Sequence, residues 1–400
     1  SDTLHNNYVK NGKYGKMFHN KQLFRRIAVL GVFVLLFCMT HSRQETDMPV
    51  YGDKIWDQTV SAAEFGLEGE AASQPVSKLH AKAACLMEWE SGRVLLDKQM
   101  NEKMPMASTT KIMTAILVLE NIPMDQEVTF SSYAASMPDV QLNARPDETF
   151  YVKDLLYSLL LESHNDTAVA LAEAVSGSVE AFAEKMNEKA VELGCTGTHF
   201  VTPNGLDESD HYSCAKDLCL IASYALHNDT FCELIRTASH TFCSLSSRRT
   251  FVVYNHDSFL NGYQGALGIK TGFTSKAGYC FVGAARRNGM TLVGCVLSSG
   301  WPPNKSWKYR DTAVMMDYGF QAYHNVVIQP VQKTIPRPVR GKDNRQIFLK
   351  VPEDAEAFTY PLQSGEWILF RVTMTPGGTG QETVSLPDGT IHQWPLEPEN

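Results

Sequence analysis

Three short polar segments occur in a fixed order along this 400-residue chain, and they constrain its fold more than any other feature. They are Ser108-Thr109-Thr110-Lys111, Ser163-His164-Asn165 and Lys270-Thr271-Gly272. Acyl transfer uses such side chains, because they pair a hydroxyl with an amine, a hydroxyl with an amide and a cation with a hydroxyl. If all three line one pocket, the fold must bring together a helix start, a helix–helix turn and a strand.

The first two segments lie next to helical patterns. Apolar residues recur at helical spacing from Ile112 to Leu119, so Ser108 is predicted to open a helix. Ser108 and Lys111 would then lie three positions apart, with their β-carbons roughly 5–6 Å from each other. An apolar helical face at positions 155, 156, 159 and 160 ends shortly before Ser163, which predicts that Ser163 lies at an exposed helix–helix turn.

The third segment lies in the run 268–274, which predicts a strand. In a regular strand, Lys270 and Gly272 point to one face and Thr271 points to the other. We therefore expect a bulge or a twist that lets both Lys270 and Thr271 serve the pocket.

Strand-like runs before and after a helical middle predict an α+β fold. Hairpin signals at Glu90-Ser91-Gly92 and Asn288-Gly289 favour an antiparallel sheet, and the stretch 152–234 is mainly helical. After Val326, short β-like runs alternate with Pro and Gly. The predicted domains are 1–42, an N-terminal tail with a signal or anchor segment; 43–79, a linker; 80–324, the catalytic domain; and 325–400, a small β-rich C-terminal domain.

The N-terminal segment carries an export signature. Lys21, Arg25 and Arg26 precede the apolar run 27–39, which is shorter than a membrane-spanning helix needs. We expect an exported protein at the extracytoplasmic face of the membrane or secreted. Cleavage of the segment stays open.

Composition excludes two classes of function. The net charge of −8 and the lack of a basic stripe argue against a nucleic-acid binder. The nine cysteines include no C-x-x-C pair, which argues against a structural zinc site. Cys85, Cys280 and Cys295 lie in apolar runs and are expected to be small buried hydrophobes.

Serine attacks a carbonyl only when a base removes its proton, and Lys111 is the candidate base for Ser108. Burial and repulsion from Lys270 would both lower the pKa of Lys111. Ser213-Cys214-Ala215-Lys216 has the same form, but we expect Ser213 to be a helix N-cap followed by Asp217 in the first turn.

With these residues in place, the chain resembles the serine-type D-alanyl-D-alanine carboxypeptidases, the low-molecular-weight penicillin-binding proteins. The likeness extends over about 81–320. It is carried by the segments 103–115, 161–166, 203–207, 211–213, 268–274 and 277–279. The resemblance implies a β-lactamase/transpeptidase-like antiparallel sheet flanked by helices, with a helical subdomain and a small C-terminal all-β domain.

The resemblance also implies the site and its partners. In chain order it gives the nucleophile Ser108, the proton acceptor Lys111, the proton shuttle Ser163, the substrate ligand Asn165, the carboxylate ligands Lys270 and Thr271, and Phe273, whose N–H would complete an oxyanion hole with that of Ser108. The substrate would be a peptidoglycan stem peptide ending in D-Ala-D-Ala, and β-lactams would be covalent inhibitors. No metal or organic cofactor is implied.

Two departures from the family pattern stand out. His164 occupies a position where the family usually has Gly, and we expect its side chain to point outward. The family's C-terminal amphipathic anchor has no counterpart, so membrane contact would fall to the run 27–39.

Two other functions fit the motifs less well. A class A β-lactamase needs a deacylating Glu with an Asn four positions later, but Glu208 is followed at that spacing by Tyr212. A penicillin sensor that acylates without turnover would need a signalling domain, and the short N-terminal stretch offers none.

Overall fold

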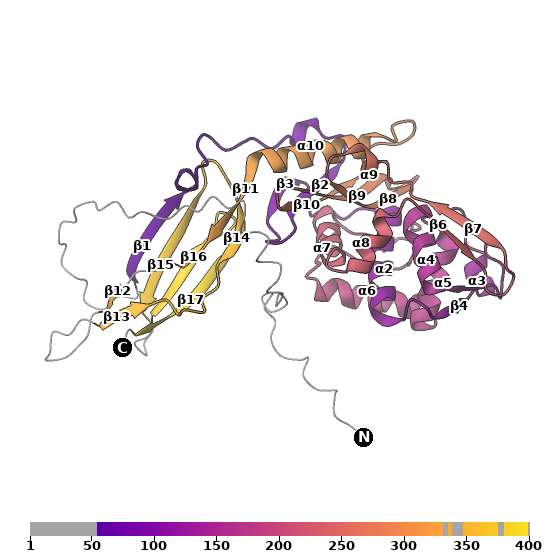
Figure 1. Ribbon diagram of the computed structural model, residues 1–400. Coiled ribbons are helices and arrows are strands. Elements are labelled where there is room, and N and C mark those ends of the chain that lie inside the picture. Colours follow the sequence, from indigo (N-terminus) through magenta and orange to yellow (C-terminus); the bar gives the residue numbers. More distant parts are fainter. Residues whose placement is uncertain (1–53, 331–334, 338–346, 375–379, 399–400) are drawn as a thin grey trace, which may run out of the picture. The chain divides into compact units, whose positions relative to one another are not determined.

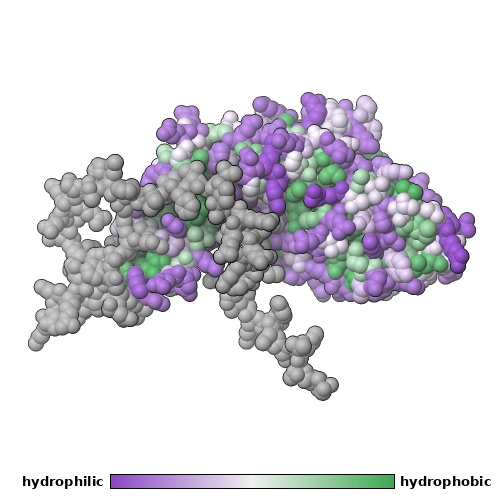
Figure 2. Space-filling view, viewed as in Figure 1, coloured by the Kyte–Doolittle hydropathy of each residue, from purple (hydrophilic) through white to green (hydrophobic). Residues whose placement is uncertain are grey.

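The computed structural model describes residues 54–330, 335–337, 347–374 and 380–398 (Figure 1). The predicted signal or anchor segment lies outside these residues. Among the helices that are described, none is both long enough and apolar enough to cross a bilayer. On the face drawn in Figure 2, hydrophobic residues occur as patches among hydrophilic ones.

A five-stranded antiparallel sheet organises the catalytic part of the chain, with the strand order β3-β2-β10-β9-β8. Its strands are β2 (Ala83–Glu88), β3 (Val94–Lys98), β8 (Ala266–Thr274), β9 (Gly278–Arg287) and β10 (Met290–Leu297). Both predicted hairpins are present, because β2 pairs with β3 and β9 pairs with β10. The strand that carries the third polar segment, β8, lies at the edge of this sheet, where a ligand can approach it.

Helices cover both faces of the sheet, which explains why β2 and β10 are buried along their whole length. Leu86 and Leu292 pack with Met316 of the helix α10 (Trp307–Ala322) in one core, whereas Cys85 and Val293 belong to the larger core on the other side. The alternation of neighbouring residues between two cores is what a strand with a period of two produces. Cys85, Cys280 and Cys295 are fully buried free thiols, as predicted.

The helical middle of the chain is confirmed. Figure 1 shows α10 on one side of the sheet and the group containing α2, α4, α5, α6, α7 and α8 on the other. The helices are α2 (Lys111–Asn121), α3 (Ser132–Ala135), α4 (Val152–Tyr157), the π-helical turn η4 (Ser158–Glu162), α5 (Asn165–Ser176), α6 (Val179–Glu192), α7 (Ala215–Ala225), α8 (Asp229–Arg236), α9 (Ser258–Gly262) and α10 (Trp307–Ala322). Two hairpins accompany this group, β4 (Glu127–Thr129) with β5 (Thr149–Tyr151) and β6 (Ser239–Cys243) with β7 (Thr250–Tyr254).

A second, six-stranded sheet has the order β1-β15-β16-β17-β13-β12. Its strands are β1 (Lys54–Ser61), β12 (Ile335–Arg337), β13 (Ile347–Lys350), β15 (Trp367–Met374), β16 (Gly380–Ser385) and β17 (Ile391–Pro398), and β11 (Tyr323–Ile328) pairs separately with β14 (Phe358–Gln363). The β1 strand corrects one expectation, because it lies in the stretch 43–79 that was predicted to be a linker. Its residues pair with β15, and Val60 and Ile368 share the core of this sheet.

Candidate active site

The nucleophile candidate Ser108 lies in a 3-10 turn, Ala107–Thr110, that leads directly into α2. The prediction that Ser108 opens a helix is confirmed, with a tighter first turn than expected. The hydroxyls of Thr109 and Thr110 donate back to backbone carbonyls of Met106 and Ala107 at 2.7 and 2.9 Å. Both threonines are therefore internally satisfied, while Ser108 stays partly exposed at the start of the helix.

The amine of Lys111 is completely buried and has three oxygen neighbours. Its Nζ lies 2.9 Å from Ser108 Oγ, 2.8 Å from Asn165 Oδ1 and 2.6 Å from the carbonyl oxygen of Asn204. The Asn165 and Asn204 oxygens can only accept hydrogen bonds, whereas the Ser108 hydroxyl can donate one. A neutral amine matches this set, because it has two N–H donors for the acceptors and one lone pair for the hydroxyl proton.

The electrostatics favour the same neutral form. Burial, and secondly repulsion from Lys270, hold the pKa of Lys111 well below its usual value, while Asp166 opposes them. Desolvation penalises a buried charge, and a second cation nearby adds to that penalty. The amine of Lys111 is therefore within hydrogen-bond distance of the Ser108 hydroxyl and in the neutral form that can accept a proton.

Asn165 is held by the loop at residues 138–140. Its Nδ2 donates to the carbonyls of Pro138 and Asp139, both at 3.1 Å, and its backbone N–H donates to Val140 at 2.7 Å. The neighbouring Asp166 carboxylate accepts from backbone N–H groups of the same loop, at positions 142 and 144. The amide orientation of Asn165 is thus fixed, with its oxygen toward Lys111.

Ser163 follows η4 and adopts a left-handed backbone conformation with φ of 69°. This confirms a helix–helix turn at that position. The Ser163 hydroxyl is buried, and it has no hydrogen-bond partner among the described residues. A left-handed non-glycine residue and an unpaired buried hydroxyl each cost free energy, and such costs are typical of functional sites.

The expected outward orientation of His164 is wrong. Its side chain is buried, and its Nδ1 lies 2.8 Å from the hydroxyl of Ser158. Burial lowers the pKa of His164 to about 4, so the ring is neutral near pH 7.

The edge strand β8 brings Lys270 to the site. Its side chain is buried, and burial lowers its pKa to about 8 against the opposing effect of Asp257. Lys270 Nζ donates to the carbonyl of Thr271 at 3.1 Å. Its repulsion of Lys111 places both amines in one electrostatic environment.

Gly272 lets β8 lie directly against the nucleophile turn. A β-carbon added there would lie 2.9 Å from Ser108 N and 3.1 Å from Ala107 Cβ. The bulge expected at Lys270 and Thr271 is not found in β8, because its register shift lies upstream, between Ala266 and Gly268. Thr271 therefore alternates regularly with Lys270 and is partly exposed.

Phe273 continues the strand beyond Gly272. Its side chain is 41% exposed, and its ring lies 4.6 Å from that of Tyr279, centroid to centroid. The structure thus joins Ser108, Lys111 and Asn165 by hydrogen bonds. Lys270 belongs to the same site because it repels Lys111 and because its strand, β8, packs against the nucleophile turn at Gly272. Phe273 is the exposed residue next to this contact.

Two supports of the nucleophile turn carried no separate signal in the sequence. His211 Nε2 lies 2.9 Å from Thr110 Oγ1, and its Nδ1 accepts from the N–H of Val201 at 3.0 Å. Burial lowers the pKa of His211 to about 4, so it is neutral, with its proton on Nε2. Asn204 contributes only a backbone carbonyl, which any residue type would supply.

The second Ser-x-x-Lys segment serves the framework. Ser213 is fully buried, and its hydroxyl lies 2.8 Å from that of Thr198. The N-cap of α7 is Cys214, so the expectation of an N-cap at Ser213 was wrong by one position.

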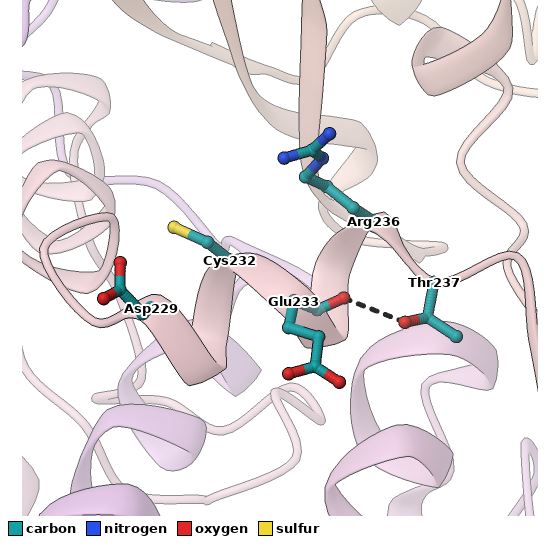
Figure 3. A pocket seen from close by; sticks show the side chains of 5 residues that line it. All are labelled: Asp229, Cys232, Glu233, Arg236 and Thr237. Atoms are coloured by element: carbon teal, nitrogen blue, oxygen red, sulfur yellow. Dashed lines mark hydrogen bonds between the residues drawn. The ribbon is translucent and has the colours of Figure 1, made fainter.

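A surface hollow on α8 is distinct from these residues. It is lined by Asp229, Cys232, Glu233, Arg236 and Thr237, and Figure 3 shows that all five come from this helix or the residue after it. The Thr237 hydroxyl donates to the Glu233 carbonyl at 2.9 Å, and burial raises the pKa of the Cys232 thiol. The hollow therefore lacks an activated nucleophile. Among the described residues, no group of three potential ligands could hold a metal ion.

Comparisons with known proteins agree with this geometry. A family model described as D-alanyl-D-alanine carboxypeptidase matches residues 68–300. The D-alanyl-D-alanine carboxypeptidase DacF of Bacillus subtilis is 34% identical over 276 residues, covering 68% of this chain and 70% of that protein. A D-alanyl-D-alanine carboxypeptidase of a Streptomyces species is 37% identical over 246 residues, covering 58% of this chain and 84% of that protein.

Solved structures give the same result. The crystal structure of the Streptomyces K15 DD-transpeptidase aligns with a TM-score of 0.58 and 33% identity, covering 62% of this chain and all of that one (100%). The chain belongs to the D-alanyl-D-alanine carboxypeptidase family. These findings confirm the predicted family, the α+β fold and the enzyme class, a serine-type D-alanyl-D-alanine carboxypeptidase.

Proposed function

We propose that Ser108 removes the terminal D-Ala from peptidoglycan stem pentapeptides through an acyl-enzyme, with Lys111 as its base. The observation that carries the proposal is the 2.9 Å separation of Lys111 Nζ from Ser108 Oγ, with the amine buried between two acceptors. A nucleophile within hydrogen-bond reach of a base of lowered pKa is the arrangement that acyl transfer needs.

Each of the two proposed steps, acylation and hydrolysis, moves one proton, forms one bond to the carbonyl carbon and breaks another. Lys111 takes the proton of Ser108, whose oxygen attacks the carbonyl carbon of the penultimate D-Ala. The backbone N–H groups of Ser108 and Phe273 stabilise the negative oxygen, a contribution of several kcal/mol to the barrier in such sites. Lys111 hands this proton through Ser163 to the leaving nitrogen, the C–N bond breaks and D-Ala departs. Water then attacks the ester carbonyl, one of its protons returns through Lys111 to Ser108 Oγ, and the bond to Ser108 breaks.

Lys270 and Thr271 are proposed to bind the terminal carboxylate of the peptide, with the twist of the edge strand β8 bringing both side chains to it in place of the bulge that β8 lacks at these residues. At pH 7, Lys270 is mostly protonated, since its pKa is lowered only to about 8. Asn165 is proposed to bind a substrate peptide group when one of its two loop contacts is exchanged. β-Lactams would acylate Ser108 at the same place.

The remaining proposals concern the cellular setting and the parts of the chain. Because the family acts on peptidoglycan, we place the reaction outside the cytoplasm, and we propose export through the N-terminal segment, with membrane contact if that segment is retained. Residues 80–324 are proposed to carry the activity and 325–400 to form an accessory β domain, to which 54–61 adds a strand.

The test uses diacetyl-Lys-D-Ala-D-Ala and a fluorescent penicillin. Wild type should release D-Ala and become labelled, Ser108→Ala should do neither, and Ser213→Ala should do both as a matched control. Stable acylation without D-Ala release would instead indicate a penicillin sensor. Labelling that survives Ser108→Ala would overturn the nucleophile assignment, and intact-mass analysis would report the acylation stoichiometry.

A further inference from the structure

The His164 side chain links the two helices that flank Ser163. Its Nδ1 lies 2.8 Å from the hydroxyl of Ser158, the first residue of η4. The same Ser158 oxygen lies 2.9 Å from the hydroxyl of Thr167 in α5. The three side chains therefore tie the helix before Ser163 to the helix after it.

Glu162, on the other side of Ser163, is also anchored. Its Oε1 accepts the backbone N–H of Tyr254 at 2.9 Å. Its Oε2 lies 3.2 Å from His256 Nε2 and 3.9 Å from His164 Nε2. The residues immediately before and after Ser163 are thus held by side-chain contacts that converge on one carboxylate and one hydroxyl.

One arrangement of protons fits the two hydrogen bonds of Ser158 and the nearby Glu162 carboxylate, which at 3.9 Å is too far from His164 Nε2 for a hydrogen bond but close enough to favour a proton there. The Nε2–H of His164 faces the Glu162 carboxylate, so Nδ1 carries the lone pair. The Ser158 hydroxyl then donates to Nδ1, and the Thr167 hydroxyl donates to Ser158. This arrangement requires a neutral ring, which agrees with the burial of His164.

The network flanks Ser163, whose backbone conformation is unfavourable for a non-glycine residue. A left-handed backbone costs free energy for a non-glycine residue, and so does a buried hydroxyl without a hydrogen-bond partner. Ser163 has both features. Such a conformation persists only where the surroundings hold it.

We propose that His164 is a positioning residue that holds Ser163 in its left-handed conformation through the Ser158 hydroxyl, which keeps the Ser163 hydroxyl free to carry a proton. The inference rests on the shuttle role proposed above for Ser163 and deepens it, because it assigns a function to a position that otherwise departs from the family pattern. His164 itself exchanges no proton with the substrate.

Two substitutions of His164 separate the hydrogen bond from the packing of the ring. His164→Phe keeps a buried ring without an acceptor, whereas His164→Asn keeps an acceptor near the place of Nδ1. We expect His164→Phe to lower the rate constant of acylation by a fluorescent penicillin about tenfold, and His164→Asn to recover most of it. Ser158→Ala, which leaves the ring in place, should be as slow as His164→Phe. The double variant should be no slower than the slower single one, because both remove the same bond.

The control is His392→Phe, which replaces a histidine of β17 in the second sheet, where its ring is stacked on Phe358 at 3.8 Å. It should change the melting temperature without changing the acylation rate per folded molecule. If His164→Phe and Ser158→Ala both acylate at the wild-type rate while Ser163→Ala is slow, the role of His164 is refuted but the shuttle role of Ser163 stands. Wild-type acylation by Ser163→Ala would overturn the shuttle role together with the role of His164. Additive losses in the double variant, or no recovery in His164→Asn, would also overturn the inference.

Discussion

Gly272 lies directly against the nucleophile turn, and Gly272→Ala tests this contact between the first and third polar segments. The added methyl group would lie 2.9 Å from Ser108 N, 3.1 Å from Ala107 Cβ and 3.2 Å from the Met106 carbonyl oxygen. No real β-carbon tolerates 2.9 Å from a backbone atom, and the neighbours here are mainly backbone. The strand and the turn must therefore move apart.

The size of that movement sets the expected effect. Restoring an ordinary contact of 3.4 Å requires about 0.5 Å of displacement between Gly272 and Ser108. A misplacement of 1 Å near a reacting group can cost about 10²-fold in rate, so half of it should cost about tenfold. Overpacking at a tight contact costs about 1–3 kcal/mol of stability. We expect slower acylation and a lower melting temperature together.

Acylation by a fluorescent penicillin, followed as a second-order rate constant, measures the first effect, and thermal unfolding measures the second. Gly262→Ala is the matched control, because no atom lies within 4 Å of its added methyl group. It should leave both quantities within error of wild type. If Gly272→Ala acylates as fast as Gly262→Ala, β8 does not lie against the nucleophile turn, and the shared pocket loses its geometric basis.

Three further predictions follow from charge and burial. Lys270→Met should abolish carboxypeptidase turnover while the protein stays folded. It should also move the acid limb of the acylation pH profile to higher pH, because the repulsion that lowers the pKa of Lys111 is gone. An acid limb that stays at the wild-type pH would refute the coupling between the two lysines. Stability should fall as the pH drops from about 6.5 to about 4, by roughly 1.4 kcal/mol per pH unit for each buried neutral histidine, since the unfolded chain binds the proton first. His211→Gln should make that slope shallower, as urea titrations at several pH values would show, and an unchanged slope would contradict the buried neutral form. Among the cysteines of the described residues, Cys243 should react first with a thiol reagent in the native protein, because it alone is exposed; mass mapping that finds a core cysteine equally reactive would contradict the burial.

Signals that lie within a few residues of each other were sufficient for much of this fold. Asn288 and Gly289 both have positive φ, 49° and 81°, which is what a tight hairpin turn demands and what this dipeptide supplies readily. The apolar face ahead of Ser163 likewise placed the helix–helix turn. The three polar segments could be joined into one site because the chemistry of each is incomplete without the others.

Other features depend on partners far away along the chain. The β1 strand pairs with β15, more than 300 positions later, so no turn signal announces it. The Asn204 carbonyl is a backbone group with no side-chain signature. His164 turned inward because the hydroxyl of Ser158 offered a partner across the turn, and spacing alone could not weigh that contact.

The two buried lysines of the candidate site, Lys111 and Lys270, explain why a site with a cation can also contain a base. Lys270 keeps enough proton affinity to be mostly charged at pH 7, since its pKa falls only to about 8 and Asp257 opposes the fall. Lys111 is likewise opposed by one carboxylate, Asp166, but it is repelled by the charge of Lys270, and its hydrogen-bond neighbours are two acceptor oxygens and one hydroxyl. Lys270, the residue proposed to attract an anionic substrate, therefore also helps to keep Lys111 neutral. Binding of the substrate carboxylate would weaken that repulsion, so Lys111 must remain neutral mainly because it is buried, which is the larger of its two causes.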